Sequence, residues 1–180
     1  MHTYIALFRG INVGGNNMLP MKELRALLEN LDLQNVKTYI QSGNVVFRSE
    51  ENRVSQLSST ISTAIKENHG FEPQVLLLKI EDMEKAMESN PFPEAESEPK
   101  TLHLNFLASV PEHPDLKALE NFRKESERFE LQGNVFYLHA PDGIGRSKLA
   151  ANAERLLGVS MTGRNWRTVR KIMAMVKEYE

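Results

Sequence analysis

The 180-residue sequence contains no cysteine and no long apolar run. The first absence excludes disulfides, thiolate metal sites and cysteine nucleophiles, and it is typical of proteins in a reducing compartment. The second excludes a membrane-spanning helix, which needs about 20 consecutive apolar residues. The N-terminus also lacks the basic and apolar regions of a signal peptide. We therefore expect a cytoplasmic protein without a membrane partner.

Motifs for catalysis and metal binding are missing as well. The five histidines are scattered without H-x-x-x-H or H-E-x-x-H spacing, and no serine lies in a G-x-S-x-G sequence. No pair of carboxylates stands out as an acid and a base. The sequence therefore predicts no metal site and no cofactor, and it leaves open whether the protein is an enzyme.

The formal net charge is only −2, but the charges are unevenly distributed. Acids dominate between residues 81 and 98, whereas cations dominate between residues 144 and 177. The basic part contains Arg146, Lys148, Arg155, Arg164, Arg167, Arg170, Lys171 and Lys177 against Glu154 alone. Such polarity indicates either an anion-binding face or two solvated surfaces of opposite charge.

Hydrophobic periodicity predicts a β-α-β-β-α-β order in the first half of the chain. The elements are a strand at residues 3–8, a helix that begins at Pro20, a hairpin at 38–47, a helix at 52–68 ended by Gly70, and a strand at 75–80. A helix at residues 81–89 follows. The next segment is rich in proline and glutamate, which is typical of a linker.

The same order returns after residue 100. The elements are a strand at 101–107, a helix at 114–124, a hairpin at 128–139, a helix at 145–157, a short strand at 159–161 and a basic helix at 164–178. We therefore predict an α+β fold with two ferredoxin-like halves, each followed by a helix, and we interpret the repeat as a duplication. The predicted domains are residues 1–90 and 101–180, joined by a linker at 91–100.

Both hairpins contain a Gly-Asn pair, at residues 43–44 and 133–134. Glycine at the first turn position supplies the positive φ of a two-residue type II′ turn. In the first hairpin, alternation then places Ile40, Val45 and Phe47 on the helix-covered face. The core residues of the second hairpin are Phe129, Leu131, Phe136 and Leu138. The opposite face is polar and aromatic in both halves, as expected for an open binding platform or for a surface where the two sheets meet.

The loop at residues 10–17 joins a strand to a helix, where backbone N–H groups and a helix N-terminus can hold an anion. Its spacing matches no known phosphate-binding motif. The alternative is a loop that needs left-handed conformations, which Gly and Asn tolerate best. The candidate ligand-binding residues of this loop and of the first hairpin are Arg9, Gly10, Asn12, Gly14, Gly15, Asn17, Tyr39, Gln41, Ser42, Gly43 and Asn44.

Further candidates lie in the basic C-terminal part: Arg146, Ser147, Lys148, Arg164, Asn165 and Trp166. The first three put two cations and a hydroxyl at a helix start, which suits a phosphate or an ordinary serine cap. The last three open the final helix, which Thr162 or Asn165 can cap. We interpret Trp166 as a core anchor in preference to a base-stacking ring. The neighbouring cationic stripe, formed with Arg167 and Lys171, suits phosphates or RNA.

Three stretches, LFRGINVGGNN, VKTYIQSGNVVF and TGRNWRTV, together resemble the bacterial Domain of Unknown Function 1697 family. The resemblance extends over residues 3–175, and Phe8 stands where a leucine is commoner in that family. It implies an α+β fold with two ferredoxin-like halves, in agreement with the periodicity. It implies no established activity and assigns no role to the motif residues.

The loops and the basic C-terminal region favour a protein that binds a phosphate-bearing ligand: a nucleotide, a metabolite or single-stranded RNA. RNA-recognition domains share the β-α-β-β-α-β order but stack bases on aromatic rings, and Val46 and Arg48 stand here where such rings are expected. Two alternatives remain, an enzyme acting on a small polar metabolite and a protein-interaction module whose motifs are purely structural. The sequence does not determine the oligomeric state.

Overall fold

The first sheet is built around an apolar central strand. In the computed structural model, which describes residues 1–179, the sheet has the antiparallel order β2-β3-β1-β4. Its strands are β1 (His2–Arg9), β2 (Gln34–Tyr39), β3 (Asn44–Ser49) and β4 (Gln74–Lys79). The central strand β1 is at most 1% exposed from Tyr4 to Phe8, so both of its faces are covered.

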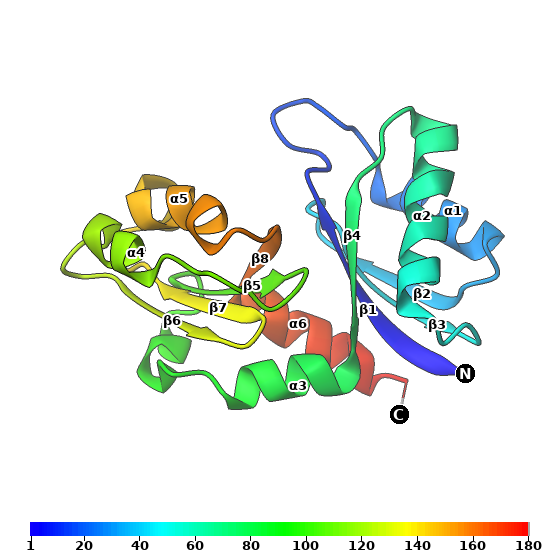
Figure 1. The fold of residues 1–180 in the computed structure, drawn as a ribbon. Helices are drawn as coiled ribbons and strands as arrows, with labels where there is room; N and C mark the ends of the chain where they lie inside the picture. The colour runs from blue at the N-terminus through cyan, green and yellow to red at the C-terminus, as the bar shows by residue number, and fades with distance from the viewer. Residues whose placement is uncertain (180) are drawn as a thin grey trace. The chain divides into compact units, whose positions relative to one another are not determined.

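Two helices, α1 (Met21–Asn30) and α2 (Val54–His69), lie together on one face of this sheet (Figure 1). Each turns one apolar stripe toward the core, since residues three and four apart share a helix face. The buried leucines and isoleucines are Leu24, Leu27 and Leu28 in α1 and Leu57, Ile61 and Ile65 in α2. The predicted end of α2 is confirmed, because Gly70 takes a φ of 80° and its N–H donates to Lys66 O.

The second sheet repeats this order as β6-β7-β5-β8, again antiparallel. Its strands are β5 (Leu102–Leu107), β6 (Arg128–Gln132), β7 (Val135–His139) and β8 (Met161–Asn165). The helices α4 (Leu116–Phe122) and α5 (Lys148–Leu157) lie on one side of it (Figure 1). Their shared core includes Leu107, Leu119, Phe136, Leu138, Leu149 and Leu157.

The protein therefore has a mixed α+β fold with two four-stranded antiparallel sheets in two similar halves, as the periodicity predicts. The remaining elements are α3 (Ile80–Glu88), the 3-10 helices η1 (Pro93–Ser97) and η2 (Ile144–Arg146), and α6 (Trp166–Lys177). No helix within residues 1–179 is both long and apolar enough to cross a membrane.

The chain divides into two units whose limits differ from the predicted ones. The first unit comprises Met1–Glu84 and the chain from Lys171 onward, and the second comprises Lys85–Arg170. The segment expected to be a linker contains η1, and its Phe92 and Ala95 are 8% and 4% exposed. These apolar side chains are buried while most of the neighbouring glutamates remain exposed, so the segment packs as part of the second unit.

The predicted two-residue turn of the first hairpin is wrong. Tyr39 pairs with Asn44, which leaves a loop of four residues. Ile40 lies in this loop and is 49% exposed instead of facing the core. The loop is wider because Asn44 Nδ2 donates to Tyr39 O at 2.9 Å, so a side chain closes it. Val45 and Phe47 do face the core, as predicted.

The second hairpin follows the prediction. Gln132 pairs with Val135, so Gly133 and Asn134 form a two-residue turn in which Gly133 has a φ of 56°. All four core residues predicted for this hairpin belong to the second core or pack against it.

Candidate functional site

The loop at residues 10–17 forms a small hairpin of its own. Val13 and Asn16 form a β-bridge, and the Asn16 N–H donates to Val13 O at 2.9 Å. Between them, Gly14 and Gly15 have φ values of 57° and 76°. A type I′ turn requires positive φ at both of these positions. The turn therefore accounts for the two adjacent glycines.

Asn12 and Asn17 direct their side-chain amides to the backbone. Asn12 Nδ2 donates to Leu19 O at 2.9 Å and to Gln41 O at 2.8 Å, and Asn12 Oδ1 accepts from the Leu19 N–H at 2.7 Å. Asn17 Nδ2 donates to Gly10 O at 2.9 Å. The contact between Asn12 and Gln41 places this loop beside the first hairpin. The structure thus brings these two predicted motifs together.

Gly43 lies where the first hairpin meets the end of β1. A Cβ atom at this position would lie 2.7 Å from both Phe8 Cβ and Ile11 Cδ1. The Phe8 N–H donates to Gly43 O at 2.9 Å. Asn44 is fully buried, and its Nδ2 lies 3.2 Å from Ser42 Oγ in addition to its bond with the backbone. Close packing and these hydrogen bonds therefore explain structurally why Gly43 and Asn44 occupy these positions.

The other candidates at this end of the first unit are Arg9, Tyr39 and Gln41. Arg9 ends β1, and its Nη1 lies 3.4 Å from Gln74 Oε1 in β4. Tyr39 is half-buried at the end of β2, and Gln41 is exposed. Polar groups from both motifs thus gather at one end of the first sheet.

Exposed apolar side chains on the same two loops were missed by sequence reasoning. Val13, Met18 and Ile40 are 63%, 59% and 49% exposed. The sequence did contain a signal for these exposed side chains, because an apolar residue within a polar, glycine-rich loop has no core nearby in which to be buried. Contiguous apolar patches mark contact surfaces, whereas singly exposed apolar side chains are common on protein surfaces.

The candidates Arg146, Ser147 and Lys148 lie at the start of α5. Ser147 is buried, and its Oγ accepts from the Ala150 N–H at 3.0 Å. This cap makes α5 begin at Lys148 and not at residue 145 as predicted. Arg146 and Lys148 are exposed. The Ser147 hydroxyl oxygen thus caps the helix, and the side chains of Arg146 and Lys148 face solvent.

The candidates Arg164 and Asn165 end β8, and α6 begins two residues later than predicted, at Trp166. The reason is that Arg164 pairs with Leu104 in the second sheet. Asn165 Oδ1 accepts from the Thr168 N–H at 3.0 Å and so caps α6. Trp166 is 4% exposed, in agreement with a core anchor. Burial lowers the pKa of the Arg164 guanidinium to about 10.

The helix α6 has one buried face and one basic face. The buried face carries Val169, Ile172, Met173 and Val176. The exposed face carries Arg167, Arg170, Lys171, Ala174 and Lys177. None of these four cations forms a salt bridge with any residue of the described chain. Sequence reasoning found part of this face but joined Arg164 to it, which belongs to β8.

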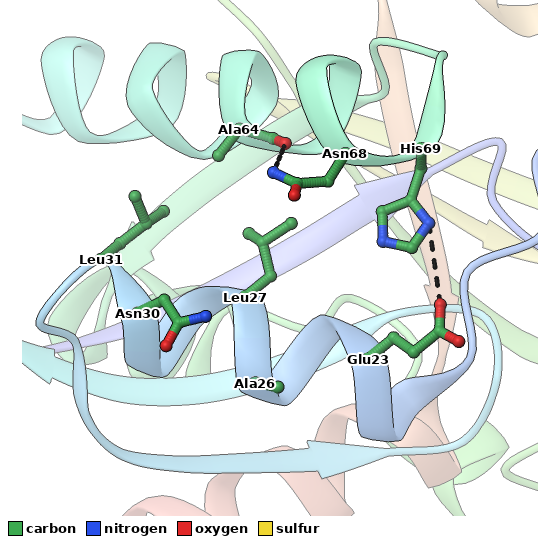
Figure 2. A pocket seen from close by; sticks show the side chains of 8 residues that line it. All are labelled: Glu23, Ala26, Leu27, Asn30, Leu31, Ala64, Asn68 and His69. Atoms are coloured by element: carbon green, nitrogen blue, oxygen red, sulfur yellow. Dashed lines mark hydrogen bonds and ion pairs between the residues drawn. The ribbon is translucent and has the colours of Figure 1, made fainter.

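A groove of about 400 Å³ lies between α1 and α2 (Figure 2). Leu27, Leu31 and Ala64 contribute apolar surface to it, and at one end His69 Nδ1 lies 3.7 Å from Glu23 Oε2. Sequence reasoning did not find this groove. Its polar groups are too few and too dispersed to hold a phosphate. Within residues 1–179, no cluster of three or more His, Asp or Glu side chains is arranged to hold a metal ion.

Comparison with known proteins agrees with the resemblance seen in the motifs. The family model described as "Protein of unknown function (DUF1697)" matches residues 1–137. The chain belongs to the DUF1697 family. The loop at residues 10–17 and the first hairpin lie within the region that matches the DUF1697 model. The residues Arg164, Asn165 and Trp166 lie beyond it.

A solved structure described as a conserved bacterial protein from Streptococcus pneumoniae is similar to this DUF1697 chain. The TM-score is 0.70 at 29% sequence identity, and the match covers 98% of this chain and 99% of the other. No curated protein matches the chain.

Proposed function

We propose that this protein binds a phosphate-bearing ligand, and that the ligand is the backbone of a single-stranded nucleic acid along the basic face of α6. The observation that carries the proposal is the row of four exposed cations without salt bridges among the described residues: Arg167, Arg170, Lys171 and Lys177. At a rise of 1.5 Å per residue, this row extends over about 15 Å. A row of that length suits contact with several phosphates of an extended strand.

The ligand is expected to bind through its backbone and not through its bases. Base recognition in single strands uses exposed aromatic rings. Here Trp166 is 4% exposed, and Tyr137 is 1% exposed with its hydroxyl donating to Ala86 O at 2.6 Å. Binding should therefore be insensitive to base sequence and strongly sensitive to salt.

The salt dependence of RNA binding tests this proposal. We would measure the affinity for a short oligouridine by fluorescence anisotropy between about 50 and 200 mM salt. The logarithm of affinity falls by about 0.7 per decade of salt for each phosphate contacted, so contacts by all four cations predict a slope of about −2.8. The double variant Arg167→Gln/Lys171→Gln should reduce the slope to about −1.4.

A matched control removes the same charge elsewhere. Lys79 and Lys117 are exposed and lie outside α6. The double variant Lys79→Gln/Lys117→Gln should retain the wild-type slope. A flat salt dependence, or an equal loss of affinity in both double variants, contradicts the proposal.

A protein-interaction role is the second candidate function, favoured by the exposed Val13, Met18 and Ile40 on adjacent loops. In this case the loops present an apolar contact surface. Sedimentation of the wild-type protein over a range of concentrations tests whether that surface joins two copies. The variant Val13→Ser/Ile40→Ser should abolish any assembly, whereas a wild-type protein that stays monomeric contradicts self-association.

We also infer that both units are ferredoxin-like and arose by duplication. Support comes from the identical β-α-β-β-α-β order and from the matching strand orders, β2-β3-β1-β4 and β6-β7-β5-β8. A cytoplasmic location stays a prediction that is based on the absence of cysteine.

A further inference from the structure

A polar pocket lies in the first unit beside the edge strand β2. Its volume is about 610 Å³, which is within the range of sites for small molecules. The wall is formed by α1, β2, β3 and the residues that follow α6. The side chains that matter for its chemistry are Arg25, Glu29, Lys37, Arg48, Glu178 and Tyr179.

Tyr179 forms one side of the pocket. Its hydroxyl donates to Asn35 O and lies 3.2 Å from Val46 O. The Nζ atom of Lys37 lies 4.8 Å from the centre of the Tyr179 ring. These contacts attach the segment after α6 to β2 and β3, and they give the pocket an aromatic wall.

The charged groups of the pocket are unequally satisfied. Arg25 Nε lies 2.9 Å from Glu29 Oε1, and Lys37 forms an ion pair with Glu178. The Nε atom of Arg48, in contrast, is buried and has no hydrogen-bond partner among the described residues. A buried guanidinium N–H without an acceptor is unfavourable. Arg48 also forms no ion pair among the described residues, so it is the cation that this pocket leaves unpaired.

We propose that this pocket binds a small molecule carrying a phosphate monoester, with phosphate oxygens accepting hydrogens from the terminal Nη groups of Arg48. A phosphate monoester has a charge of about −2 and three acceptor oxygens. One phosphate thus serves both the planar guanidinium of Arg48 and the ammonium of Lys37. The ring of Tyr179 offers a surface for the apolar part of the molecule.

Glu178 is the group that the ligand has to displace. Its carboxylate pairs with Lys37, so the pocket already accommodates an anionic oxygen at this ammonium. The variant Glu178→Gln removes the competing charge and keeps the size of the side chain. Phosphate affinity should therefore rise in this variant.

Calorimetric titration of the 180-residue chain with inorganic phosphate and with phenyl phosphate tests the proposal. We expect the wild type to bind both probes, with the higher affinity for phenyl phosphate because of the Tyr179 ring. Arg48→Lys keeps the positive charge but removes the planar pair of Nη groups, and it should weaken binding about tenfold or more, as expected for loss of one charge-assisted hydrogen bond. Glu178→Gln should tighten binding by a few-fold.

Two control variants separate this site from other cations. Arg53 lies in the same unit and pairs with Glu51 outside the pocket, so Arg53→Gln should bind phosphate like the wild type. The double variant Lys79→Gln/Lys117→Gln, whose lysines lie outside the pocket, should also bind phosphate like the wild type. The phosphate titration and the RNA-binding experiment use different variants, so the two proposals can fail independently.

Four results would overturn the proposal: no phosphate binding by the wild type, equal affinity in Arg48→Lys, unchanged affinity in Glu178→Gln, or acetate binding as tight as phosphate. Arg48 is half-buried, so its variant needs a check of folding by circular dichroism. The side chain of Glu178 is 56% exposed. Glu178→Gln therefore keeps the test decisive even if Arg48→Lys unfolds the protein.

Discussion

Gly43 illustrates how two physical constraints can meet at one residue. It combines a φ of 85° with contacts that a Cβ atom would make at 2.7 Å to Phe8 and Ile11. Gly70 has nearly the same backbone conformation, with a φ of 80°, but nothing lies within 4 Å of its Cβ position. Alanine substitutions at these two glycines, both in the first unit, therefore distinguish the cost of backbone strain from the cost of steric contact.

Gly43→Ala should lower the free energy of unfolding more than Gly70→Ala. The left-handed backbone alone predicts a loss of about 1 kcal/mol for Gly70→Ala. For Gly43→Ala we expect about 3 kcal/mol, because overpacking adds about 1–3 kcal/mol. Urea denaturation followed by circular dichroism measures both variants. Equal losses would mean that Phe8 and Ile11 move aside without cost.

Two histidines in the second unit should make its stability depend on pH. Burial lowers the pKa of His103 and of His139 below the ordinary value of 6.5. Next to His139, Arg128 Nη2 lies 3.0 Å from Nδ1 and further disfavours protonation. The unfolded chain then binds protons more readily than the folded protein. The free energy of unfolding should therefore fall as the pH drops below 6.5 toward the lower pKa values of the folded state.

Urea denaturation at about pH 8 and about pH 5.5 brackets the ordinary histidine pKa. We expect a lower midpoint at the acidic pH, and a smaller decrease in the double variant His103→Gln/His139→Gln. The carboxyl of Glu94 also has a lowered pKa, through its backbone and Arg128 hydrogen bonds, but it acts only below its ordinary value of 4.5. An identical decrease in the wild type and the double variant would exclude the histidines as the cause.

At the scale of elements, hydrophobic spacing predicted the order of the helices and strands because it reports burial directly. The short strand predicted at residues 159–161, however, is β8 at Met161–Asn165. The predicted strand at residues 75–80 is β4 at Gln74–Lys79, one residue away. The first hairpin failed, because its loop has four residues: the Gly43 N–H donates to Ile40 O, and the buried Asn44 side chain donates to Tyr39 O. Sequence patterns describe backbone turns well but carry little information about such side-chain closures.

The two Gly-Asn pairs are not equivalent in the fold. The Phe8 N–H donates to Gly43 O in the first sheet, and the Leu107 N–H donates to Asn134 O at the same place in the second. Gly43 thus corresponds to Asn134, and the two pairs are offset by one residue. An alignment that matches the two Gly-Asn pairs by sequence is therefore shifted by one residue from the alignment that matches the two sheets. Element order remains the better argument for a duplication.

The candidate site was predictable only where its residues are close in sequence. The glycine turn at residues 14–15 follows from local backbone preferences. The bond from Asn12 to Gln41 joins residues 29 positions apart, and no local pattern indicates it. Arg48 gave no signal either, because its position in a pocket without an ion-pair partner among the described residues becomes evident only in the folded chain.

Asn165→Ala should weaken the first turn of α6. The asparagine oxygen accepts from the Thr168 N–H, and loss of such a cap costs about 1 kcal/mol. Hydrogen exchange of the first turn should become faster in Asn165→Ala. Asn165→Asp keeps the acceptor and should retain protection. Equal exchange rates in both variants would argue against the cap.

At the scale of the whole molecule, the first unit is discontinuous in sequence. It includes the chain from Lys171 onward, where Ile172 and Val176 are at most 1% exposed. In the same segment, the Tyr179 hydroxyl contacts Val46 O in β3. The folded first unit therefore depends on residues from two distant parts of the chain.

A chain that ends at Arg170 should lose protection against hydrogen exchange in β3, because these buried side chains are missing. The second unit lies within Lys85–Arg170, so β7 should keep its protection. A chain that ends at Lys177 lacks the contacts of Glu178 and Tyr179 and should show an intermediate loss in β3. Full protection of β3 in the shortest chain would contradict this dependence.

The same discontinuity sets an order of events on the ribosome. About 86 residues, from Lys85 to Arg170, are synthesised between the two parts of the first unit. At about 5–20 residues per second, they delay its completion by about 4–17 s. During this interval the edge strand β2 lacks the segment that carries Tyr179, and an uncovered edge can pair with other chains. Slow translation of the codons for Lys85–Arg170 should therefore increase aggregation of the nascent protein.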